Sequence, residues 1–312
     1  MKLLSLDVFY VVAGSFLLLV AARAARDRTH PTRWGSTVFW GLLAMIFLGG
    51  KALPPIAVGG PLLTIRRAHS QRLQLADLVR AGAVAPPLAA FLHAAVIGRC
   101  NIVVSGGTGA GKTTLLAALC ALVPPDQRIV TIEDVAELRV DHPHVVAQQC
   151  RDRIVDTVAP IDMRALLRNT LRMRPDRIVV GEVRGAEAAD MVAAMNTGHP
   201  GSMSTVHANT AHDALSRLEA MLALAWSGLS SETIRTWLVT AVDVVVHCDR
   251  DASGHRAVTE VAAMDDHNLT TIYQSPQGDS AVIARPARRC LDRMSRHGVD
   301  FTPDLLTRRH VA

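Results

Sequence analysis

Two long apolar runs open the chain. Residues 3–22 contain one charged side chain, that of Asp7, and residues 34–50 contain none. Both lengths are near the lower end of the about 17–25 residues that a transmembrane helix needs. We therefore expect residues 1–53 to form an apolar hairpin of two transmembrane helices. A secretory signal is the alternative, because Lys2, an apolar run and an Ala-Arg-Ala motif resemble one, and the second apolar run argues against it.

The charges around these runs leave the orientation of the hairpin open. The loop between the runs carries four arginines against one acid, Asp27, so the positive-inside tendency would keep this loop in the cytoplasm. Basic residues after the second run, beginning with Lys51, favour the opposite orientation.

Beyond Pro54 the pattern changes to short apolar runs that alternate with helical periodicity. The runs predict an isolated strand at residues 62–67 and further strands at 128–134, 144–148, 177–182, 203–207, 243–247 and 256–264. Helices are expected at 74–82, 86–98 and, in a tail without predicted strands, 286–297. This alternation is typical of an α/β fold with a mostly parallel sheet covered by helices on both faces.

Charged and aromatic residues are unevenly distributed. Residues 1–53 hold six basic and two acidic side chains, whereas the remaining 259 residues hold 27 basic and 26 acidic ones and five of the twelve aromatic residues. A surface that stacks nucleic-acid bases needs positive charge and aromatic side chains, so we expect no nucleic-acid partner. The five cysteines are widely spaced without a C-x-x-C motif, which indicates buried thiols in a reducing compartment. His142 and His144 suggest a metal by their spacing only, and without a set of further ligands we expect no zinc.

Residues 106–113, Gly-Gly-Thr-Gly-Ala-Gly-Lys-Thr, fit the phosphate-loop pattern G-x-x-x-x-G-K-[ST]. A β-branched run precedes them and a helical run follows, which is the order that a phosphate loop requires. Lys112 is one of three lysines in the chain, which indicates a specific need for an ammonium group. The alternative is a glycine-rich turn with an accidental Lys-Thr pair. We expect ATP and Mg²⁺ here, with Thr113 as the metal ligand and contacts from Gly106, Gly107, Thr108, Gly109, Ala110, Gly111, Lys112, Thr113 and Thr114.

Three other strand candidates end in polar residues that hydrolysis of a γ-phosphate could use. Glu182 is our candidate for orienting the attacking water, and its alternative is a cap of the next helix. Glu133 could hold Mg²⁺ through water or polarise the nucleophile, and its alternative is a solvated pair with Asp134. His207 could act on the phosphate, and its alternative is a satisfied histidine of the core.

Arginines form a further group of candidates. Arg164, Arg168 and Arg172 fall four residues apart on a helical pattern. This spacing indicates either a solvated helix face or an interface where one subunit offers arginine to the nucleotide of its neighbour. The candidate arginines are Arg139, Arg168, Arg172 and Arg184.

Four stretches together closely resemble the type II/type IV secretion ATPase family. They are GGTGAGKTT from residue 106, TIED from residue 131, LRMRPDRIVVGEVRG from residue 171 and STVHAN from residue 204. The family calls them Walker A, Asp box, Walker B and His box. A fifth stretch, AMNTGHPG from residue 194, looks most like the CpaF-like branch that assembles tight-adherence (Tad, Flp) pili.

This resemblance implies a RecA-like core, a homo-hexameric ring and ATP hydrolysis coupled to work on an inner-membrane platform protein. It also implies roles for single residues. Lys112 and Thr113 would hold phosphates and Mg²⁺, and Glu133 would belong to the Asp box. Glu182 would be catalytic, and His207 would read the γ-phosphate.

The chain departs from the family before residue 62, where relatives usually carry a separate N-terminal domain and this chain has the apolar hairpin. We therefore expect a transmembrane segment at 1–53, a linker with one remaining strand at 54–73 and a RecA-like ATPase domain at 74–312. The expected location is the inner (cytoplasmic) membrane, with the ATPase domain on the cytoplasmic side. The alternative is a membrane-tethered, catalytically impaired nucleotide-binding remnant of a gene fusion or domain loss.

Overall fold

The computed structural model describes residues 49–52, 58, 62–65, 72–151, 159–275 and 282–301, and the chain divides into two units, Met1–His69 and Ser70–Ala312. In the first unit, β1 (Gly49–Ala52) pairs antiparallel with β2 (Leu62–Ile65). The strand predicted near residue 62 is therefore confirmed, but it is not isolated.

The predicted apolar helix at 34–50 is wrong at its end. Gly49 and Gly50 belong to β1 and pair with Ile65 and Thr64. Glycine is a poor helix former, so the extended conformation at this position agrees with its propensity. The rest of the predicted hairpin lies outside the described residues. Within the described ranges, every helix is too short or too polar to cross a membrane.

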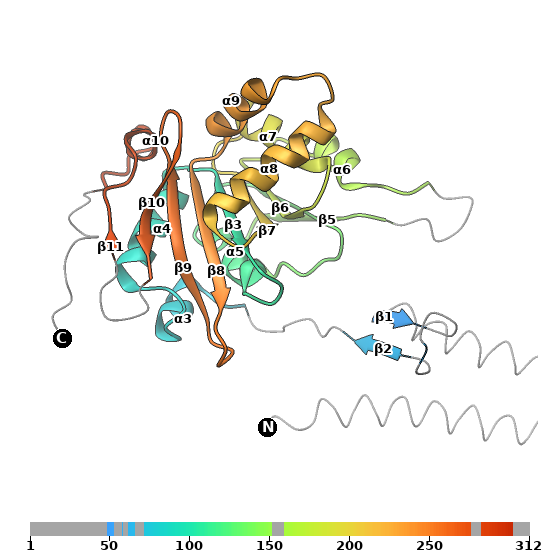
Figure 1. Cartoon of the computed structure of the whole chain (residues 1–312), viewed down its shortest axis with the longest axis horizontal. Coiled ribbons are helices and arrows are strands. Elements are labelled where there is room, and N and C mark those ends of the chain that lie inside the picture. Colours follow the sequence, from blue (N-terminus) through green and yellow to red (C-terminus); the bar gives the residue numbers. More distant parts are fainter. Residues whose placement is uncertain are drawn as a thin grey trace, which may run out of the picture. The chain divides into compact units, whose positions relative to one another are not determined.

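The second unit is built on a nine-stranded sheet in the order β11-β10-β9-β8-β3-β7-β6-β4-β5 (Figure 1). The strands in chain order are β3 (Ile102–Gly106), β4 (Ile129–Glu133), β5 (Val145–Gln149), β6 (Arg177–Val183), β7 (Met203–His207), β8 (Val244–Arg250), β9 (Arg256–Met264), β10 (Leu269–Gln274) and β11 (Val282–Ile283). The six strands from β8 to β5 are parallel, and β9, β10 and β11 continue the sheet antiparallel. The predicted mostly parallel sheet is thus confirmed.

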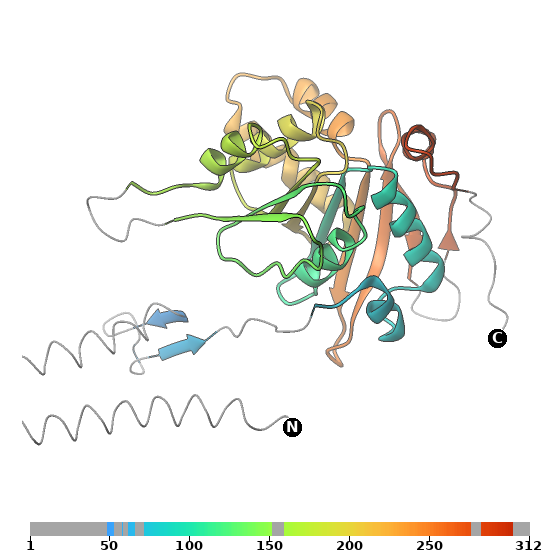
Figure 2. The same ribbon diagram turned by 180° about the vertical axis from the view of Figure 1, so that it is seen from behind.

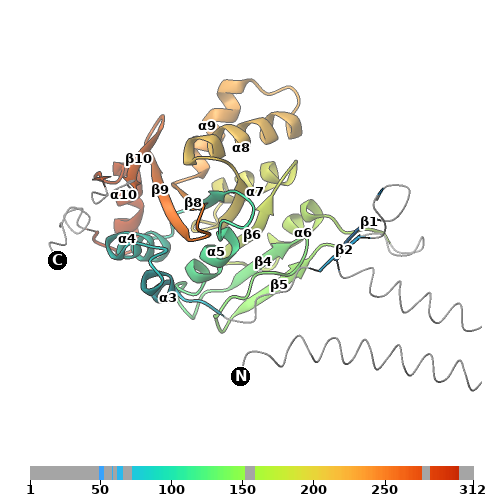
Figure 3. The same cartoon turned by 60° about the horizontal axis from the view of Figure 1, so that its bottom comes forward.

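Helices cover both faces of this sheet (Figure 3). One face packs against α3 (Leu75–Arg80), α4 (Pro86–Ile97), α5 (Lys112–Cys120) and α10 (Arg288–Arg296). The other packs against α6 (Met163–Thr170), α7 (Glu187–Asn196), α8 (Ala211–Ala225) and α9 (Ser231–Ala241). Seen from behind, the teal helix α4 lies beside the red helix α10 (Figure 2).

The apolar runs of the sequence explain why the central strands are buried on both sides. Ile102 and Val104 of β3 point into one core, and Val103 between them points into the other. All three are fully buried, as alternating side chains of a strand between two helical layers must be.

No strand was predicted in the tail from about residue 270, but the structure has one at its start. Leu269–Gln274 forms β10 and pairs with β9 from Met264 to Glu260. A turn in which Asp265 N donates to Asn268 O joins the two strands. The run contains two threonines and a bulge after Thr271, so its apolar alternation is weak in the sequence.

The sheet order places four loops at one edge. Parallel strands present their carboxyl ends at the same edge of a sheet, where ligands of α/β proteins commonly bind. β3, β7, β6 and β4 are successive neighbours, so the residues that end them lie close together.

Candidate functional site

The phosphate loop runs from the end of β3 to the start of α5 and depends on its glycines. At Gly106 a Cβ would lie 2.3 Å from the carbonyl oxygen of Cys248, so no side chain fits there. Gly109 and Gly111 have φ angles of 76° and 98°, which only glycine adopts readily. Gly111 is also the N-cap of α5 and provides no side-chain cap. The amide groups of the first turn of α5 therefore face outward to bind an anion.

Lys112 reaches back across this loop. Its Nζ donates to the carbonyl oxygens of Gly106 at 3.0 Å and Gly107 at 2.9 Å. The same nitrogen lies 3.5 Å from Nδ1 of His207. The side chain is nearly buried, with 7% exposed, so the ammonium group is held at one place beside the loop.

Glu182 near the end of β6 lies between two basic side chains. Its Oε2 accepts a hydrogen bond from Arg184 Nη2 at 2.7 Å, and its Oε1 lies 2.8 Å from His207 Nε2. Oε1 is buried and accepts no hydrogen bond from the described residues, although Nε2 of His207 lies close to it. Burial raises the pKa of Glu182, but the Arg184 hydrogen bond and the charges of His207, Arg184 and Lys112 outweigh it, so the net pKa is below the ordinary value.

His207 ends β7 and joins Lys112 to Glu182. Burial lowers the pKa of His207, and the Lys112 ammonium lowers it further, against the opposing effect of Glu182. The imidazole is therefore neutral at neutral pH. An ammonium group has no acceptor, so Nδ1 facing Lys112 is unprotonated and Nε2 carries the proton. His207 is partly exposed, with 35% of its side chain accessible, so the reading as a core histidine is wrong.

Glu133 is also at this edge, but it faces its own loop. Its Oε1 accepts hydrogen bonds from the amides of Glu137 at 2.9 Å and Leu138 at 2.8 Å. Burial raises its pKa, and these two amides oppose the change. Gly181 on the adjacent strand makes room for it, because a Cβ at Gly181 would lie 2.8 Å from Glu133 Cγ. The interpretation of Glu133 as a solvated residue is wrong, since it is 5% exposed.

The candidate arginines separate into two groups. Arg184 belongs to the site, since it contacts Glu182 and lies 3.7 Å from Asp134. Arg139, Arg168 and Arg172 are exposed, and the described contacts bring none of them to Lys112 or Glu182.

The predicted arginine stripe is wrong as a continuous helical face. Helix α6 ends at Thr170, so Arg172 lies beyond it and its Nη1 donates to Arg168 O. Arg164 instead forms an ion pair with Asp190 of α7 at 2.5 Å. This pair fastens α6 to α7, which the spacing along one helix could not reveal.

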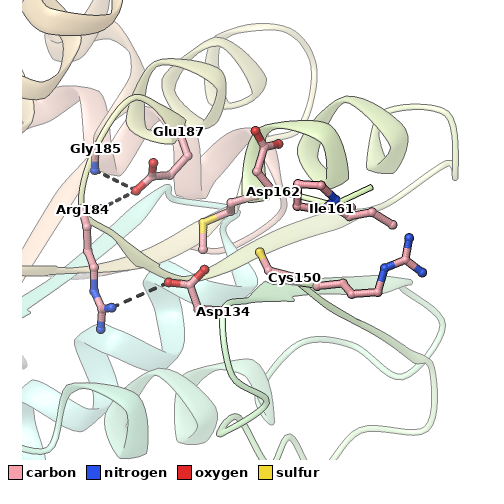
Figure 4. A pocket seen from close by; sticks show the side chains of 10 residues that line it. Asp134, Cys150, Ile161, Asp162, Arg184, Gly185 and Glu187 are labelled. Carbon is pink, nitrogen blue, oxygen red and sulfur yellow. Dashed lines mark hydrogen bonds and ion pairs between the residues drawn. The ribbon is translucent and has the colours of Figure 1, made fainter. Parts of the chain in front are cut away.

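A cavity of about 380 Å³ lies beside Arg184 (Figure 4). It is lined by residues from the ends of β4, β5 and β6 and the starts of α6 and α7, among them Asp134, Cys150, Asp162, Arg184 and Glu187. Glu187 accepts hydrogen bonds from the amides of Arg184 and Gly185, so it holds the turn after β6 in place.

Sequence reasoning missed two arginines at the phosphate loop. Arg256 at the start of β9 donates from Nε to the carbonyl oxygen of Gly109 at 2.7 Å. Arg250 at the end of β8 lies opposite Arg256 in the hairpin. Both follow the loop by more than a hundred residues, and neither has a motif around it that could have marked it.

Comparison with known proteins finds two sequence families that match parts of the chain. The sequence model of the family described as Type II/IV secretion system protein matches residues 51–304. A second model, of a family described as a protein of unknown function (DUF979), matches residues 7–84. The break in composition near Pro54 therefore falls where one match begins and within the other.

Individual relatives carry names of transfer and secretion systems. A Mycobacterium tuberculosis protein named as a conjugal transfer protein is 46% identical over 230 residues, which are 72% of this chain and 65% of that protein. The conjugal transfer protein TrbB of Rhizobium radiobacter is 41% identical over 237 residues, 74% of this chain and 69% of that protein. The chain thus spans slightly less than two thirds of the length of the mycobacterial relative.

Solved structures agree in fold. The VirB11 ATPase of the Brucella suis type IV secretion system is 33% identical, with a TM-score of 0.50 over 69% of this chain and 74% of that one. The Yersinia pseudotuberculosis ATPase DotB, at 18% identity, has a TM-score of 0.52 over 69% of this chain and 54% of that one, and shows the fold alone. With the family match over residues 51–304, these similarities lead to one conclusion: the chain belongs to the Type II/IV secretion system protein family.

Proposed function

We propose that this protein binds ATP with Mg²⁺ and hydrolyses it to drive a secretion or pilus-assembly machine. The observation that carries the proposal is the contact chain from the phosphate loop through Lys112 and His207 to Glu182. It joins a site for phosphate to a carboxylate that could orient water, and its members come from three neighbouring strands or their loops.

The geometry of the loop is compatible with a nucleoside triphosphate. Three of its glycines, Gly106, Gly109 and Gly111, occupy positions where a Cβ would clash or be strained, and the helix behind the loop begins without a side-chain cap. A polyphosphate would accept from these amides and compete with the carbonyls of Gly106 and Gly107 for the Lys112 ammonium. Thr113, the second residue of α5, would hold Mg²⁺, which supplies neutralising charge between phosphates when bound.

Glu182 and His207 would have separate roles in hydrolysis. The low pKa of Glu182 keeps it a carboxylate at neutral pH, so it can accept a hydrogen bond from a water and orient it for attack. Neutral His207 can donate from Nε2 to a phosphoryl oxygen after a small rotation away from Glu182, and this would let it report the γ-phosphate. Arg184 would hold Glu182 in position through its hydrogen bond to Oε2.

The assembly and its location are also part of the proposal. Relatives named VirB11 belong to type IV secretion systems, and on this ground we propose a homo-hexamer that works on an inner-membrane platform protein. We further propose the division at residues 1–53, 54–73 and 74–312, with the ATPase domain on the cytoplasmic side of the membrane. The tight-adherence branch remains our finer proposal, supported by the stretch that begins at residue 194. A family match over most of the chain does not favour the catalytically impaired remnant.

The test is nucleotide binding and phosphate release by the full chain. Lys112→Ala should abolish binding of a fluorescent ATP analogue, because the ammonium group beside the loop is lost. Lys51→Ala removes a lysine from outside the loop and should leave the affinity unchanged. If Lys112→Ala binds the nucleotide as tightly as the parent, the proposed nucleotide site is refuted. If the parent assembles and binds ATP but releases no phosphate, the proposed ATPase activity is refuted.

A further inference from the structure

The β8–β9 hairpin extends beyond the sheet and runs along the phosphate loop. β8 pairs with β3 up to Cys248, which lies opposite Gly106, and continues to Arg250 after β3 has ended. β9 begins at Arg256, directly opposite Arg250. The two arginines are therefore placed at the level of the loop rather than at the level of the strand before it.

Both arginines approach glycines of the loop. Arg256 donates from Nε to Gly109 O at 2.7 Å, and its Cδ would lie 3.5 Å from a Cβ at Gly111. For Arg250, the Nη1 would lie 3.9 Å from a Cβ at Gly109. Side chains at these loop positions would thus meet the hairpin, and glycine leaves the approach open.

The hairpin turn is well ordered by its own hydrogen bonds. Asp251 accepts from Ser253 Oγ at 2.6 Å and from His255 N at 2.9 Å. Gly254 has a φ of 89°, and a Cβ there would lie 3.3 Å from Arg250 Nη2. The guanidinium of Arg250 therefore lies between two glycines, one in the turn and one in the phosphate loop.

Neither guanidinium is neutralised by a residue that the structure describes. Among the described residues, no carboxylate lies within ion-pair distance of Arg250 or Arg256, and both side chains are exposed. Arg184 on the other flank is different, since it contacts Glu182 and Asp134. Two uncompensated positive charges beside an anion-binding loop attract further negative charge.

We infer that the β8–β9 hairpin is a second wall of the nucleotide site, in which Arg256 positions the phosphate loop and Arg250 binds the α- and β-phosphates. The inference rests on the proposed nucleotide binding. β8 lies on one side of β3, whereas β7 and β6, which carry His207 and Glu182, lie on the other. The hairpin therefore faces the phosphates that are not transferred, and ADP should meet it as ATP does.

The test is calorimetric titration of the full chain with Mg²⁺ and ADP. Arg250→Ala and Arg256→Ala should each weaken ADP affinity about tenfold, the usual effect of losing a charge-assisted hydrogen bond. Arg250→Lys should restore most of the affinity because it keeps the charge. Arg256→Lys should not, because its ammonium cannot reproduce the Nε–H bond to Gly109.

Controls separate this inference from protein folding and from the proposed function. Arg288→Ala removes an exposed arginine from α10, near the amino ends of β3 and β8, and should leave ADP affinity unchanged. The melting temperature without nucleotide should not change in the Arg250 variants, and the increase on adding ADP should shrink in all of the hairpin variants. If Arg250→Ala fails to fold, Arg250→Gln takes its place. Unchanged ADP affinity in Arg250→Ala or Arg250→Gln, with binding still abolished by Lys112→Ala, would overturn the inference and leave the proposed function intact.

Discussion

At the scale of single residues, Glu182 is held as a charged carboxylate. Arg184 donates to one of its oxygens, and His207 lies beside the other. These neighbours offset the burial that would otherwise favour the protonated acid. A carboxylate of low pKa is a weak base but a good acceptor for a water O–H, so its expected part is orientation.

Glu182→Gln should therefore retain nucleotide and lose phosphate release by at least about 100-fold, since the amide keeps the size of the side chain but not its charge. Binding and steady-state phosphate release of the full chain measure the two effects separately. Glu219→Gln is the matched control, because Glu219 pairs with Arg235 on the surface of α8 and α9. Turnover equal to the parent would place the catalytic carboxylate elsewhere, with Glu133 as the next candidate.

The protonation of His207 gives a second prediction. Its pKa lies below the ordinary value of 6.5, so the folded state opposes protonation and the contribution of His207 to stability is lost as the pH falls below that value. Glu182 raises this pKa, and so Glu182→Gln should lower it further. NMR of histidine-labelled protein, with His207→Asn to assign the signal, measures both. A titration above 6.5 in the parent, or an upward shift in the variant, would contradict the contacts described.

Some residues of the site could be predicted from the sequence and others could not. Glu182 and His207 were predicted because each lies at or near the end of an apolar strand, and parallel strands end at one edge. The state of Glu133 could not be predicted, because its partners are backbone amides of its own loop. Arg250 and Arg256 could not be predicted either, since their nearness to Gly109 depends on how far β8 extends past β3.

At the scale of elements, a buried arginine fixes the start of β6. Arg177 is fully buried and donates to Val96 O and Gln127 Oε1, both at 2.9 Å, and to Gly201 O at 3.4 Å. Burial lowers its pKa to about 10, which leaves it charged at neutral pH. The side chain thus ties the end of α4 and the turn before β7 to the Walker B strand.

Gly201→Ala should destabilise the fold by about 3 kcal/mol or more, because it combines backbone strain with a clash in a filled core. Gly201 has a φ of 83°, and a Cβ there would lie 1.6 Å from Arg177 Nη1. Gly198→Ala is a matched control with a φ of 98° and no neighbouring atom within 4 Å, so it should lose only about 1 kcal/mol. Urea denaturation of both variants compares them. Equal losses would show that the packing of Arg177 against residue 201 contributes nothing.

The residue at which a helix or strand ends depends on other interactions than those that make the segment a helix or a strand. The strands at 203–207 and 256–264 were predicted at their observed bounds. Polar residues that favour turns follow each of them closely, Asn209 after the first and Asp265 after the second. Helix α6 was expected to carry Arg172, yet it ends at Thr170, where the chain turns to start β6 at Arg177. Such an ending is set by where the next strand must begin, and periodicity alone does not contain that information.

At the scale of the whole molecule, the α/β domain could be predicted from alternating strands and helices and from the phosphate loop between two of them. The antiparallel extension by β10 and β11 could not, because it depends on pairing with β9. The first unit was predicted only in part, at β2, since the pairing of Gly49–Ala52 with Leu62–Ile65 brings together segments separated by three prolines.

The exposed arginines of α6 raise the question of assembly. Arg168 and Arg172 are exposed, and neither contacts Lys112, Glu182 or His207 in its own chain. A ring with head-to-tail interfaces would bring such a surface against the site of the next copy. Arginines supplied across an interface contribute about 10³–10⁵ to the rate in related phosphoryl transfer.

A mixing experiment tests this arrangement. Glu182→Gln lacks the carboxylate of its own site, and Arg168→Ala with Arg172→Ala lacks the arginines offered to the neighbour. Each protein alone should release little phosphate, whereas an equal mixture should recover measurable turnover, because some interfaces then join an intact carboxylate to intact arginines. The control is a chain that carries Arg168→Ala, Arg172→Ala and Glu182→Gln together. Mixed with the Glu182→Gln protein, it should stay inactive, because no subunit then has the carboxylate. Full activity of the arginine variant alone would show that these side chains take no part, and a mixture as inactive as its components would place them in the same subunit as the carboxylate they serve.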